Sequence, residues 1–322
     1  MSEPILKVDQ LTTTFRVARP GLFGGSQPLH AISDVSFQVN AGETLGIVGE
    51  SGCGKSTLGR SILRLIEPNS GRIQWQDNDL IQYSAEQMRQ ARRDMQIIFQ
   101  DPVASLDPRM TVGQIIAEPL DVFEKSLSRT QRETRVLEIM AAVGLTPEMI
   151  NRYPHEFSGG QAQRIGIARA VITHPKMIIC DEPVSALDVS VQAQIINLLR
   201  ELREKFQLTL LFISHDLSVV RLTSDRILVL YLGRVVESGP THEIFSNPQH
   251  PYTQALLSAA PIPDPAIRRK RIPLTGDPPS PLNLPSGCSF HTRCPKAQSH
   301  CRNTRPELRN VRGETLVACD LV

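Results

Sequence analysis

The sequence predicts an α/β fold built around a nucleotide-binding loop, and three observations lead to this prediction. Residues 49–56, GESGCGKS, fit the pattern G-x-x-x-x-G-K-[ST] at every fixed position. An apolar stretch typical of a short buried strand precedes them at 44–48, and residues 56–65 follow with the apolar spacing of a helix. Farther along, short apolar stretches alternate with helical ones, which is typical of the α/β class.

The composition is that of a soluble globular protein long enough for two domains. Of 322 residues, 40% are hydrophobic and 21% are charged, and 35 Lys+Arg against 33 Asp+Glu give a net charge of +2. That balance favours neither a nucleic-acid coat nor a membrane-binding tail. The start, MSEPILKVDQ, has no signal pattern, and no apolar run approaches the length of a spanning helix, about 18 residues. We therefore expect a cytoplasmic chain, unless a partner holds it at a membrane.

The phosphate-binding loop (P-loop) has the chemistry needed for a nucleotide. Glycines let backbone N–H groups turn toward phosphate oxygens, and the helix N-terminus adds partial positive charge. Lys55 can reach the β- and γ-phosphates, and the Ser56 hydroxyl can hold Mg²⁺. Cys53 occupies a free position, where the backbone rather than the side chain acts. The predicted nucleotide-binding residues here are Gly49, Glu50, Ser51, Gly52, Cys53, Gly54, Lys55, Ser56 and Thr57.

The first part of the chain reads as strands joined by turns. Residues 5–17 alternate as a strand, and their one aromatic, Phe15, is either a core or edge side chain or a platform for adenine. A loop rich in Gly and Pro follows at 18–28, and a second strand is predicted at 31–40. After the P-loop helix, residues 72–75 look like another strand.

The middle of the chain is mostly helical. A helix at 84–93 leads to a strand at 95–99 that ends in Gln100. Residues 111–153 form an inserted helical block with interruptions at Gly144 and Pro147. Next, Ser158, Gly159, Gly160 and Gln161 precede a helix at 162–171. Small residues there are typical either of a second phosphate-facing helix N-terminus or of ordinary capping.

Carboxylates and a histidine follow two later strands. The strand at 177–180 ends in Asp181 and Glu182; Asp181 would bind Mg²⁺ and Glu182 would polarise the attacking water, unless the pair is only a solvated turn. A helix is predicted at 189–205. His215 follows the strand at 208–213, at the end of a strand where ligands of α/β proteins bind, although a lone histidine is usually structural.

The last part of the chain changes in composition. A hairpin is predicted around Gly233, and residues 261–285 are rich in proline and predicted to be extended. Four thiols follow, with no C-x₂-C pair; they could hold zinc or an iron–sulfur cluster, with His291 or His300 replacing a ligand, or remain unconnected. Disulfides are disfavoured in a cytosolic chain. These cysteines are Cys288, Cys294, Cys301 and Cys319.

Taken in order, these motifs resemble the ATP-binding subunit of an ABC transporter, and more narrowly the dipeptide/oligopeptide (or nickel) importer subfamily. The tail at 247–257 resembles the marker of peptide importers, and the loop at 21–25, GLFGG, resembles the F-type subunit of a pair of ATPases. The matching motifs are GESGCGKST at 49–57, IIFQDP at 97–102, FSGGQ at 157–161, IICDEPVSALD at 178–188 and ISHDLSVV at 213–220.

The resemblance implies an ABC-type P-loop core with an antiparallel β subdomain, a helical signature subdomain at about 103–170, and a cysteine-rich extension. The nucleotide-binding domain would span 1–246 and the extension 247–322. By position, Phe15 would stack on adenine, Gln100 would touch Mg²⁺, and Asp188 would link two ATP sites. Glu182 matches the catalytic carboxylate and His215 the switch histidine. Phe157 departs from the usual Leu but stays apolar.

The resemblance also implies partners and a place in the cell. The helix start at 158–160 would face ATP held by another subunit, so hydrolysis requires a dimer, here with a second, different ATPase subunit. Two transmembrane permease subunits, an extracytoplasmic binding protein and a position at the cytoplasmic face of the inner membrane would complete the importer; nucleic acid is not expected. The four cysteines would hold a [4Fe–4S] cluster.

The expected function is ATP hydrolysis that powers import of dipeptides or oligopeptides. The alternatives are an importer of nickel or another small solute, and a non-transport ABC ATPase. The latter usually has coiled-coil insertions or two cassettes, and this chain has neither. A module that binds ATP without hydrolysing it is disfavoured by intact Glu182 and His215.

Overall fold

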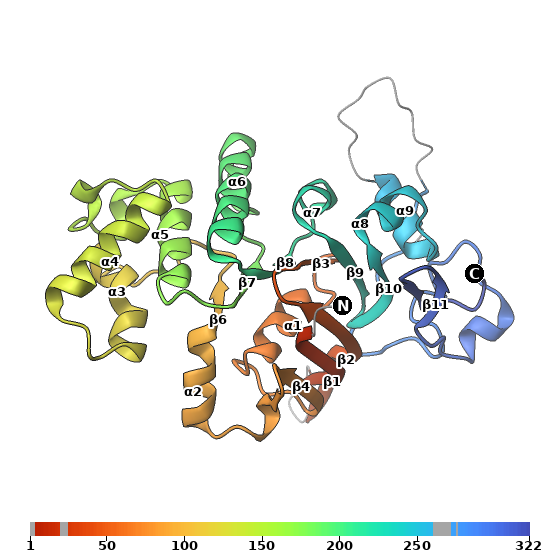
Figure 1. The fold of residues 1–322 in the computed structure, drawn as a ribbon. Helices are drawn as coiled ribbons and strands as arrows, with labels where there is room; N and C mark the ends of the chain where they lie inside the picture. The colour runs from red at the N-terminus through yellow and green to blue at the C-terminus, as the bar shows by residue number, and fades with distance from the viewer. Residues whose placement is uncertain (1–3, 20–24, 260–271, 275) are drawn as a thin grey trace. The chain divides into compact units, whose positions relative to one another are not determined.

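The computed structural model describes residues 4–19, 25–259, 272–274 and 276–322 (Figure 1). These residues form two compact units, and each is described by itself. Unit 1 contains residues 40–44 and 82–213; unit 2 contains residues 4–39, 45–81 and 214–322. Within the described ranges, none of the helices combines the length and the apolar character needed to cross a membrane.

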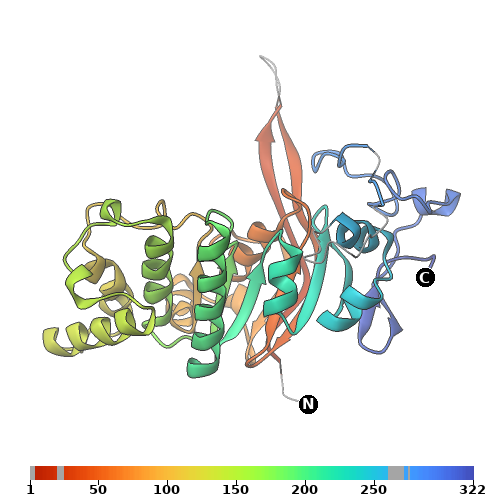
Figure 2. The same cartoon turned by 90° about the horizontal axis from the view of Figure 1, so that it is seen from above.

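Unit 2 contains an antiparallel sheet made by the first part of the chain. β1 and β2 are long neighbouring strands (Figure 2), and β4 pairs with β1 so that Leu6 lies opposite Trp75. Leu6, Leu11 and Ile73 lie in the core. Alternation alone would turn Leu11 away from the face of Leu6, but a register shift between Asp9 and Thr12, with Gln10 left-handed (φ 48°), brings it back. The strand order is β2-β1-β4-β5, with bounds β1 (Pro4–Ala18), β2 (Ser26–Asn40), β4 (Ser70–Trp75) and β5 (Asn78–Asp79).

A second group of strands in unit 2 carries the P-loop and the end of the chain. β3 pairs in parallel with β9, and β9 turns back through Gly233 into β10, as predicted for the hairpin. The order is β11-β12-β10-β9-β3, with bounds β3 (Thr44–Val48), β9 (Arg226–Tyr231), β10 (Arg234–Pro240), β11 (Arg309–Arg312) and β12 (Thr315–Val317). The helices of unit 2 include α1 (Lys55–Ile62), α7 (Leu217–Thr223), α8 (Thr241–Ser246) and α9 (Pro251–Ala259).

Unit 1 contains parallel strands that end at the same edge. β7 pairs with β6 and with β8, so that Ile98 lies opposite Cys180 and Asp181 opposite Ile213. β7 and β8 are buried throughout, which explains why they read as unbroken apolar runs. The bounds are β6 (Met95–Ile98), β7 (Met177–Asp181) and β8 (Thr209–Ile213).

Four of the described helices of unit 1 begin where the sequence offers a capping box. The hydroxyls of Ser84, Thr111, Ser128 and Ser158 accept from a backbone N–H three residues on, and a glutamine at that position bonds back. α3 packs against α4 and α5, as expected for a helical block. The helices are α2 (Ala85–Asp94), α3 (Val112–Phe123), α4 (Arg129–Ala142), α5 (Gly159–Val171) and α6 (Val189–Phe206), with single turns η2 (Pro147–Met149) and η3 (Pro154–Glu156). A further single turn, η1 (Leu80–Gln82), belongs mostly to unit 2.

Some boundaries differ from the prediction. α1 ends at Ile62 rather than at 65, because Arg64 takes a left-handed conformation (φ 48°) and Leu65 is exposed. The predicted loop at 18–28 is shorter, since β2 already begins at Ser26. The GLFGG motif lies almost wholly at residues 20–24, outside the described residues, as do residues 260–271 and 275 of the proline-rich stretch. The described remainder of that stretch contains neither helix nor strand.

Candidate functional site

The P-loop (Gly49–Thr57) lies in unit 2 between β3 and α1 and is tightly enclosed. A Cβ atom on Gly49 would lie 2.2 Å from the carbonyl oxygen of Leu230. Gly54 is left-handed (φ 104°), and a Cβ there would lie 2.2 Å from the carbonyl oxygen of Ala31. Both positions therefore require glycine. At Gly49 the reason is the close approach of Leu230, and at Gly54 it is both the close approach of Ala31 and the left-handed backbone.

Lys55 is directed into the curve of the loop. Its side chain is 4% exposed, and Nζ donates to the carbonyl oxygens of Gly49 (2.8 Å) and Glu50 (3.0 Å). Gly54 is the N-cap of α1 and provides no side-chain capping bond to the first helical N–H groups. An ammonium and a helix N-terminus without a side-chain cap form an arrangement suited to a phosphate group.

Cys53 contributes to the loop through its backbone. Its carbonyl oxygen accepts a hydrogen bond of 2.8 Å from the N–H of Gly233, which ties the loop to the β9–β10 hairpin. Burial raises the pKa of the Cys53 thiol, so the side chain is neutral near pH 7. This geometry agrees with the expectation that the backbone is what matters at this position.

Two other predicted residues of unit 2 are exposed. Phe15 lies on β1 and is 36% exposed, so it is not a core side chain; this exposure is compatible both with an edge side chain and with a stacking platform. His215 is also exposed; it follows β8 and precedes Asp216, the N-cap of α7, whose carboxylate accepts from the N–H of Ser218 at 2.8 Å. The exposed position of His215 leaves the ring accessible to a ligand, as the predicted role requires.

In unit 1, Gln100 and Glu182 meet at the carboxyl ends of β6 and β7. Nε2 of Gln100 donates to Oε2 of Glu182 at 3.0 Å, a contact that the parallel register of the two strands makes possible. Glu182 is left-handed (φ 47°), a conformation that costs about 1–3 kcal/mol in a residue other than glycine. Its N–H donates to the carbonyl oxygen of Ile213 (3.0 Å) and its carbonyl oxygen accepts from Oγ of Ser185 (3.1 Å). These bonds hold the sharp turn that directs the Glu182 carboxylate.

Asp181 is the last residue of β7 and is buried. Burial, and secondarily the Asp181 carboxylate, raise the pKa of the neighbouring Cys180 to about 12. Cys180 is therefore a neutral core thiol. The alternative of a solvated acidic turn does not describe this pair, because Asp181 is buried and Glu182 is only partly exposed.

The signature residues of unit 1 combine capping with close packing. Ser158 is the N-cap of α5, and Oε1 of Gln161 accepts from its N–H at 3.1 Å. A Cβ on Gly160 would lie 2.5 Å from Cγ1 of Val191 on α6, so this glycine also permits α5 and α6 to approach. Asp188 is the exposed N-cap of α6. The capping role is thus observed, and the packing role of Gly160 could not be read from sequence.

The four tail cysteines lie in unit 2 and form no disulfide, and Cys53 and Cys180 are also free. Burial raises the pKa of Cys288 to about 11 and also raises the pKa values of Cys294 and Cys319. The negative charge that the other tail thiols would carry also raises each of these three pKa values. Such an effect requires that the sulfurs lie near one another. Backbone N–H groups two residues on, at Phe290, Lys296 and Leu321, donate to the sulfurs of Cys288, Cys294 and Cys319.

This donor set matches the chemistry of a thiolate-bound metal, since N–H···S bonds stabilise charged sulfur. The positions of the cysteine side chains do not match a metal site. In the part of the chain that the structure describes, no three Cys, His, Asp or Glu side chains are arranged to hold one metal ion. The expected [4Fe–4S] site is therefore not present as a formed ligand set.

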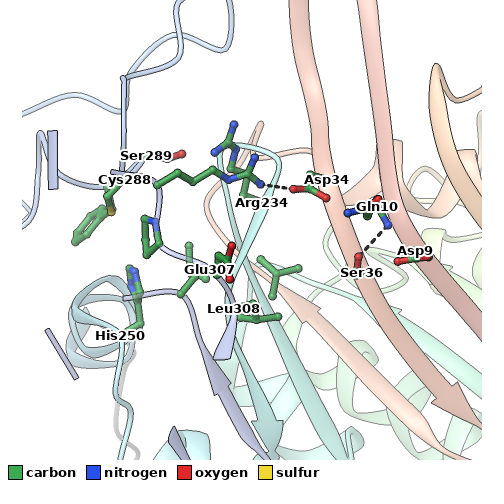
Figure 3. Close-up of a pocket in the computed structure, with 16 residues that line it drawn as sticks. Asp9, Gln10, Asp34, Ser36, Arg234, His250, Cys288, Ser289, Glu307 and Leu308 are labelled. Carbon is green, nitrogen blue, oxygen red and sulfur yellow. Dashed lines mark hydrogen bonds and ion pairs between the residues drawn. The ribbon is translucent and has the colours of Figure 1, made fainter. Parts of the chain in front are cut away.

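A hollow of about 600 Å³ in unit 2 lies apart from the P-loop residues (Figure 3). Strands β1, β2 and β10 and the tail line it, and Cys288 is the predicted site residue among its walls. The Asp34 carboxylate accepts from Arg305 at 2.8 Å, and Ser36 Oγ accepts from the Gln10 N–H at 2.8 Å. These bonds join β2 to the tail and to β1.

Sequence reasoning missed Arg293, Tyr231 and Tyr252, which contact the P-loop residue Glu50 or one another. Tyr252 lies in the marker segment at 247–257, but the sequence assigned it no contact with the P-loop. No local pattern indicates the Arg293–Glu50 contact, because these residues are 243 positions apart.

Comparison with known proteins agrees with this geometry. Residues 32–185 match the family described as ABC transporter, and residues 236–301 match the C-terminal region of the oligopeptide/dipeptide transporter family. The oligopeptide transport ATP-binding protein OppF of Haemophilus influenzae is 53% identical over 321 residues, covering 98% of this chain and 97% of the relative. OppF of Salmonella typhimurium is 57% identical over 282 residues, covering 87% and 84%.

Solved structures agree as well. The cbiO1 protein of Clostridium perfringens, part of the ABC transporter complex cbiONQ, has a TM-score of 0.65 at 29% identity and covers 76% of this chain and 92% of its own. A dimeric ATP-binding cassette, MJ0796, bound to ADP and Pi, has a TM-score of 0.65 at 29% identity and covers 73% and 98%.

The fold and the P-loop therefore define an ATPase of the ABC transporter class, which confirms the predicted fold class. The chain belongs to the ATP-binding proteins of this family whose C-terminal region is of the oligopeptide/dipeptide transporter type. ATP and Mg²⁺ are the ligands of this class.

Proposed function

We propose that this chain hydrolyses ATP to power the import of dipeptides or oligopeptides. The observation that carries the proposal is the match of residues 236–301, a segment after the one that matches the ABC transporter family, to the oligopeptide/dipeptide transporter family. Relatives at 53% and 57% identity are named for oligopeptide transport, which supports the same substrate class. A nickel importer would share the ATPase core, so uptake measurements must separate the two cargoes.

The proposed chemistry assigns each site residue a role. Lys55 binds the β- and γ-phosphates, while Ser56, Asp181 and Gln100 serve the Mg²⁺ ion. Glu182 polarises the attacking water, and its bond from Gln100 at 3.0 Å orients the carboxylate. His215 contacts the γ-phosphate. The remaining assigned contacts are adenine stacking by Phe15, nucleotide binding by Gly49, Glu50, Ser51, Gly52, Cys53, Gly54 and Thr57, and inter-subunit contacts by Ser158, Gly159, Gly160, Gln161 and Asp188.

We further propose the assembly in which this chemistry takes place. The α5 N-terminus faces ATP bound by a second, homologous ATPase subunit, and the pair acts on two permease subunits at the cytoplasmic face of the inner membrane. An extracytoplasmic binding protein delivers the peptide. The dimeric form of the related cassette MJ0796 supports a paired ATPase. Residues 1–246 would form the nucleotide-binding domain, with a helical subdomain at about 103–170, and residues 247–322 the extension.

We also propose that the tail binds a [4Fe–4S] cluster through Cys288, Cys294, Cys301 and Cys319. The N–H bonds to three of the sulfurs and the proximity of the thiols support it, and the side chains would have to rearrange to form the ligand set. When bound, the cluster would supply four iron–thiolate bonds that tie the turns of the tail together.

Anaerobically purified protein should then contain about four irons per chain. Cys294→Ser should lose the iron; stoichiometric zinc, or no metal with all four thiols alkylated, would contradict this.

The transport proposal is tested with Glu182→Gln in the complex assembled in proteoliposomes. The variant keeps the shape of the side chain and loses the acceptor charge, so it should bind ATP normally and hydrolyse it about 10²- to 10⁴-fold more slowly. Peptide uptake should fall in parallel, whereas Lys55→Ala should weaken ATP binding itself. Hydrolysis at the wild-type rate by the Gln variant would contradict the role of Glu182. Uptake of Ni²⁺ but not of labelled peptide by the wild type would contradict the cargo.

A further inference from the structure

The cysteine-bearing tail contacts the P-loop directly within unit 2. Nη1 and Nη2 of Arg293 donate to the two carboxylate oxygens of Glu50 at 2.8 and 3.1 Å. The Arg293 side chain is only 7% exposed and that of Glu50 is 28% exposed. A two-pronged bond of this kind, shielded from water, fixes both distance and orientation.

Glu50 is held from the backbone side as well. Its N–H donates to the hydroxyl of Tyr252 on α9 at 2.9 Å. Tyr252 packs with Tyr231 and Phe290, with ring centres 4.6 to 5.4 Å apart, and all three rings are fully buried. Phe290 comes from the tail, two residues after Cys288, so this aromatic cluster (Tyr231, Tyr252 and Phe290) joins the tail to the β9 strand and to α9.

Glu50 in turn positions the phosphate-binding ammonium. Its carbonyl oxygen accepts from Nζ of Lys55 at 3.0 Å, while its carboxylate is held by Arg293 and its N–H by Tyr252. Three parts of one residue are thus fixed by three different partners. A shift of Arg293 would be transmitted through Glu50 to the carbonyl oxygen that Lys55 contacts.

We propose that Arg293 is a positioning residue for nucleotide binding: it fixes the P-loop through Glu50, so that ATP affinity depends on the folded tail. This inference rests on the proposed role of the P-loop and Lys55. Because Arg293 immediately precedes Cys294, any change in how the tail cysteines are held acts at the adjoining residue. The C-terminal tail then helps to determine the affinity of the ATPase for ATP.

The test is ATP binding by the full chain, measured by calorimetry with Mg-ATP. Arg293→Met keeps an unbranched apolar stem and removes the charge and the donors, and it should weaken ATP binding about tenfold, which corresponds to about 1.4 kcal/mol. Arg293→Lys, which keeps the charge without the fork, should recover part of that affinity. Glu50→Gln should resemble Arg293→Met, and the double variant should bind no more weakly than either single one, because both break the same contact.

Matched controls separate positioning from general damage. Arg305→Met removes an exposed ion pair of the same tail, the one to Asp34, and should leave ATP affinity unchanged. Limited proteolysis after residue 272 reports whether the tail is folded in each variant. Where Arg293→Met unfolds the tail, Tyr252→Phe takes its place, since it removes one bond to the Glu50 N–H and keeps the buried ring. It should weaken ATP binding by a smaller factor.

In the assembled transporter, Arg293→Met should raise the KM for ATP while leaving kcat close to that of the wild type, because Gln100 and Glu182 are untouched. A folded Arg293→Met chain that binds ATP as tightly as the wild type would overturn the inference. Lys55→Ala separates the proposed role of the P-loop in ATP binding from the proposed positioning role of Arg293. If it fails to weaken binding, the P-loop assignment is wrong; if it weakens binding and Arg293→Met does not, only the positioning role is wrong.

Discussion

His250 is fully buried in unit 2 and is held as a neutral ring. Burial lowers the pKa of its imidazole to about 3. Nδ1 accepts from the N–H of Tyr252 at 3.1 Å, and the backbone N–H of His250 donates to the Glu237 carboxylate at 3.0 Å. Because the folded pKa lies below the unfolded value of about 6.5, the stability this ring contributes is full above that pH and is lost as pH falls toward 3.

We therefore expect His250→Asn to flatten the acid side of the stability profile. An asparagine oxygen can still accept from the N–H two residues on, but it does not titrate. Between pH 6 and pH 4 the wild type should lose up to about 1.4 kcal/mol of unfolding free energy per pH unit more than the variant. Urea unfolding at pH 7.5, 6 and 5 measures this. Burial raises the pKa of Glu237, so this carboxylate lowers the stability as pH rises, opposite to the effect of His250. It is present in both proteins, and its contribution cancels in the difference between them. Equal slopes for the two proteins would contradict the prediction.

At the scale of elements, the contact between α5 and α6 depends on one missing side chain. Gly160 lets α5 approach α6, since its Cβ would lie 2.5 Å from Cγ1 of Val191. We expect Gly160→Ala to lower the free energy of unfolding by about 1–3 kcal/mol through overpacking. Val191→Ala should restore that stability in the double variant, because it removes the atom that clashes. Urea unfolding measures each variant, with Gly166→Ala as the matched control on α5, where an added Cβ meets nothing within 4 Å.

The same pair of variants separates packing from chemistry. If the double variant regains stability but the assembled complex still fails to hydrolyse ATP, Gly160 has a role beyond packing, as a phosphate-facing residue requires. If activity returns with stability, packing alone explains the glycine.

The elements that sequence predicted well are those whose pattern is local. Apolar runs marked β7 and β8 because these strands are buried on both faces, and Ser158 marked the start of α5 because capping is a property of neighbouring residues. β11 was not predicted. Its residues, Arg309–Arg312, are mostly polar and exposed, so the strand is defined by pairing with β12 and not by alternation. The Arg293–Glu50 contact could not be predicted from a local pattern either, because only the folded chain brings these two residues together.

At the scale of the whole molecule, the chain supplies one P-loop and one signature sequence. The purified chain alone should therefore hydrolyse ATP slowly, even when it binds ATP well. Co-expression with a homologous ATPase subunit and two permease subunits should restore activity by at least about 10²-fold, the scale that a positioned catalytic group contributes. Phosphate release measured across a range of chain concentrations checks this. Full activity at concentrations where the isolated chain is monomeric would contradict the need for a partner.

The interleaving of the two units along the chain also has a consequence during synthesis. The strands β1, β2 and β4 are made early, yet their unit is completed only by residues 214–322, and β10 receives β12 only after residue 317 has been made. Unit 1, by contrast, is complete once residue 213 emerges. At ordinary rates of translation the ribosome needs of the order of ten seconds to add the remaining segment. Until β9 emerges in that interval, β3 lacks this partner, and its unpaired edge makes the nascent chain a client for chaperones before it can bind any nucleotide.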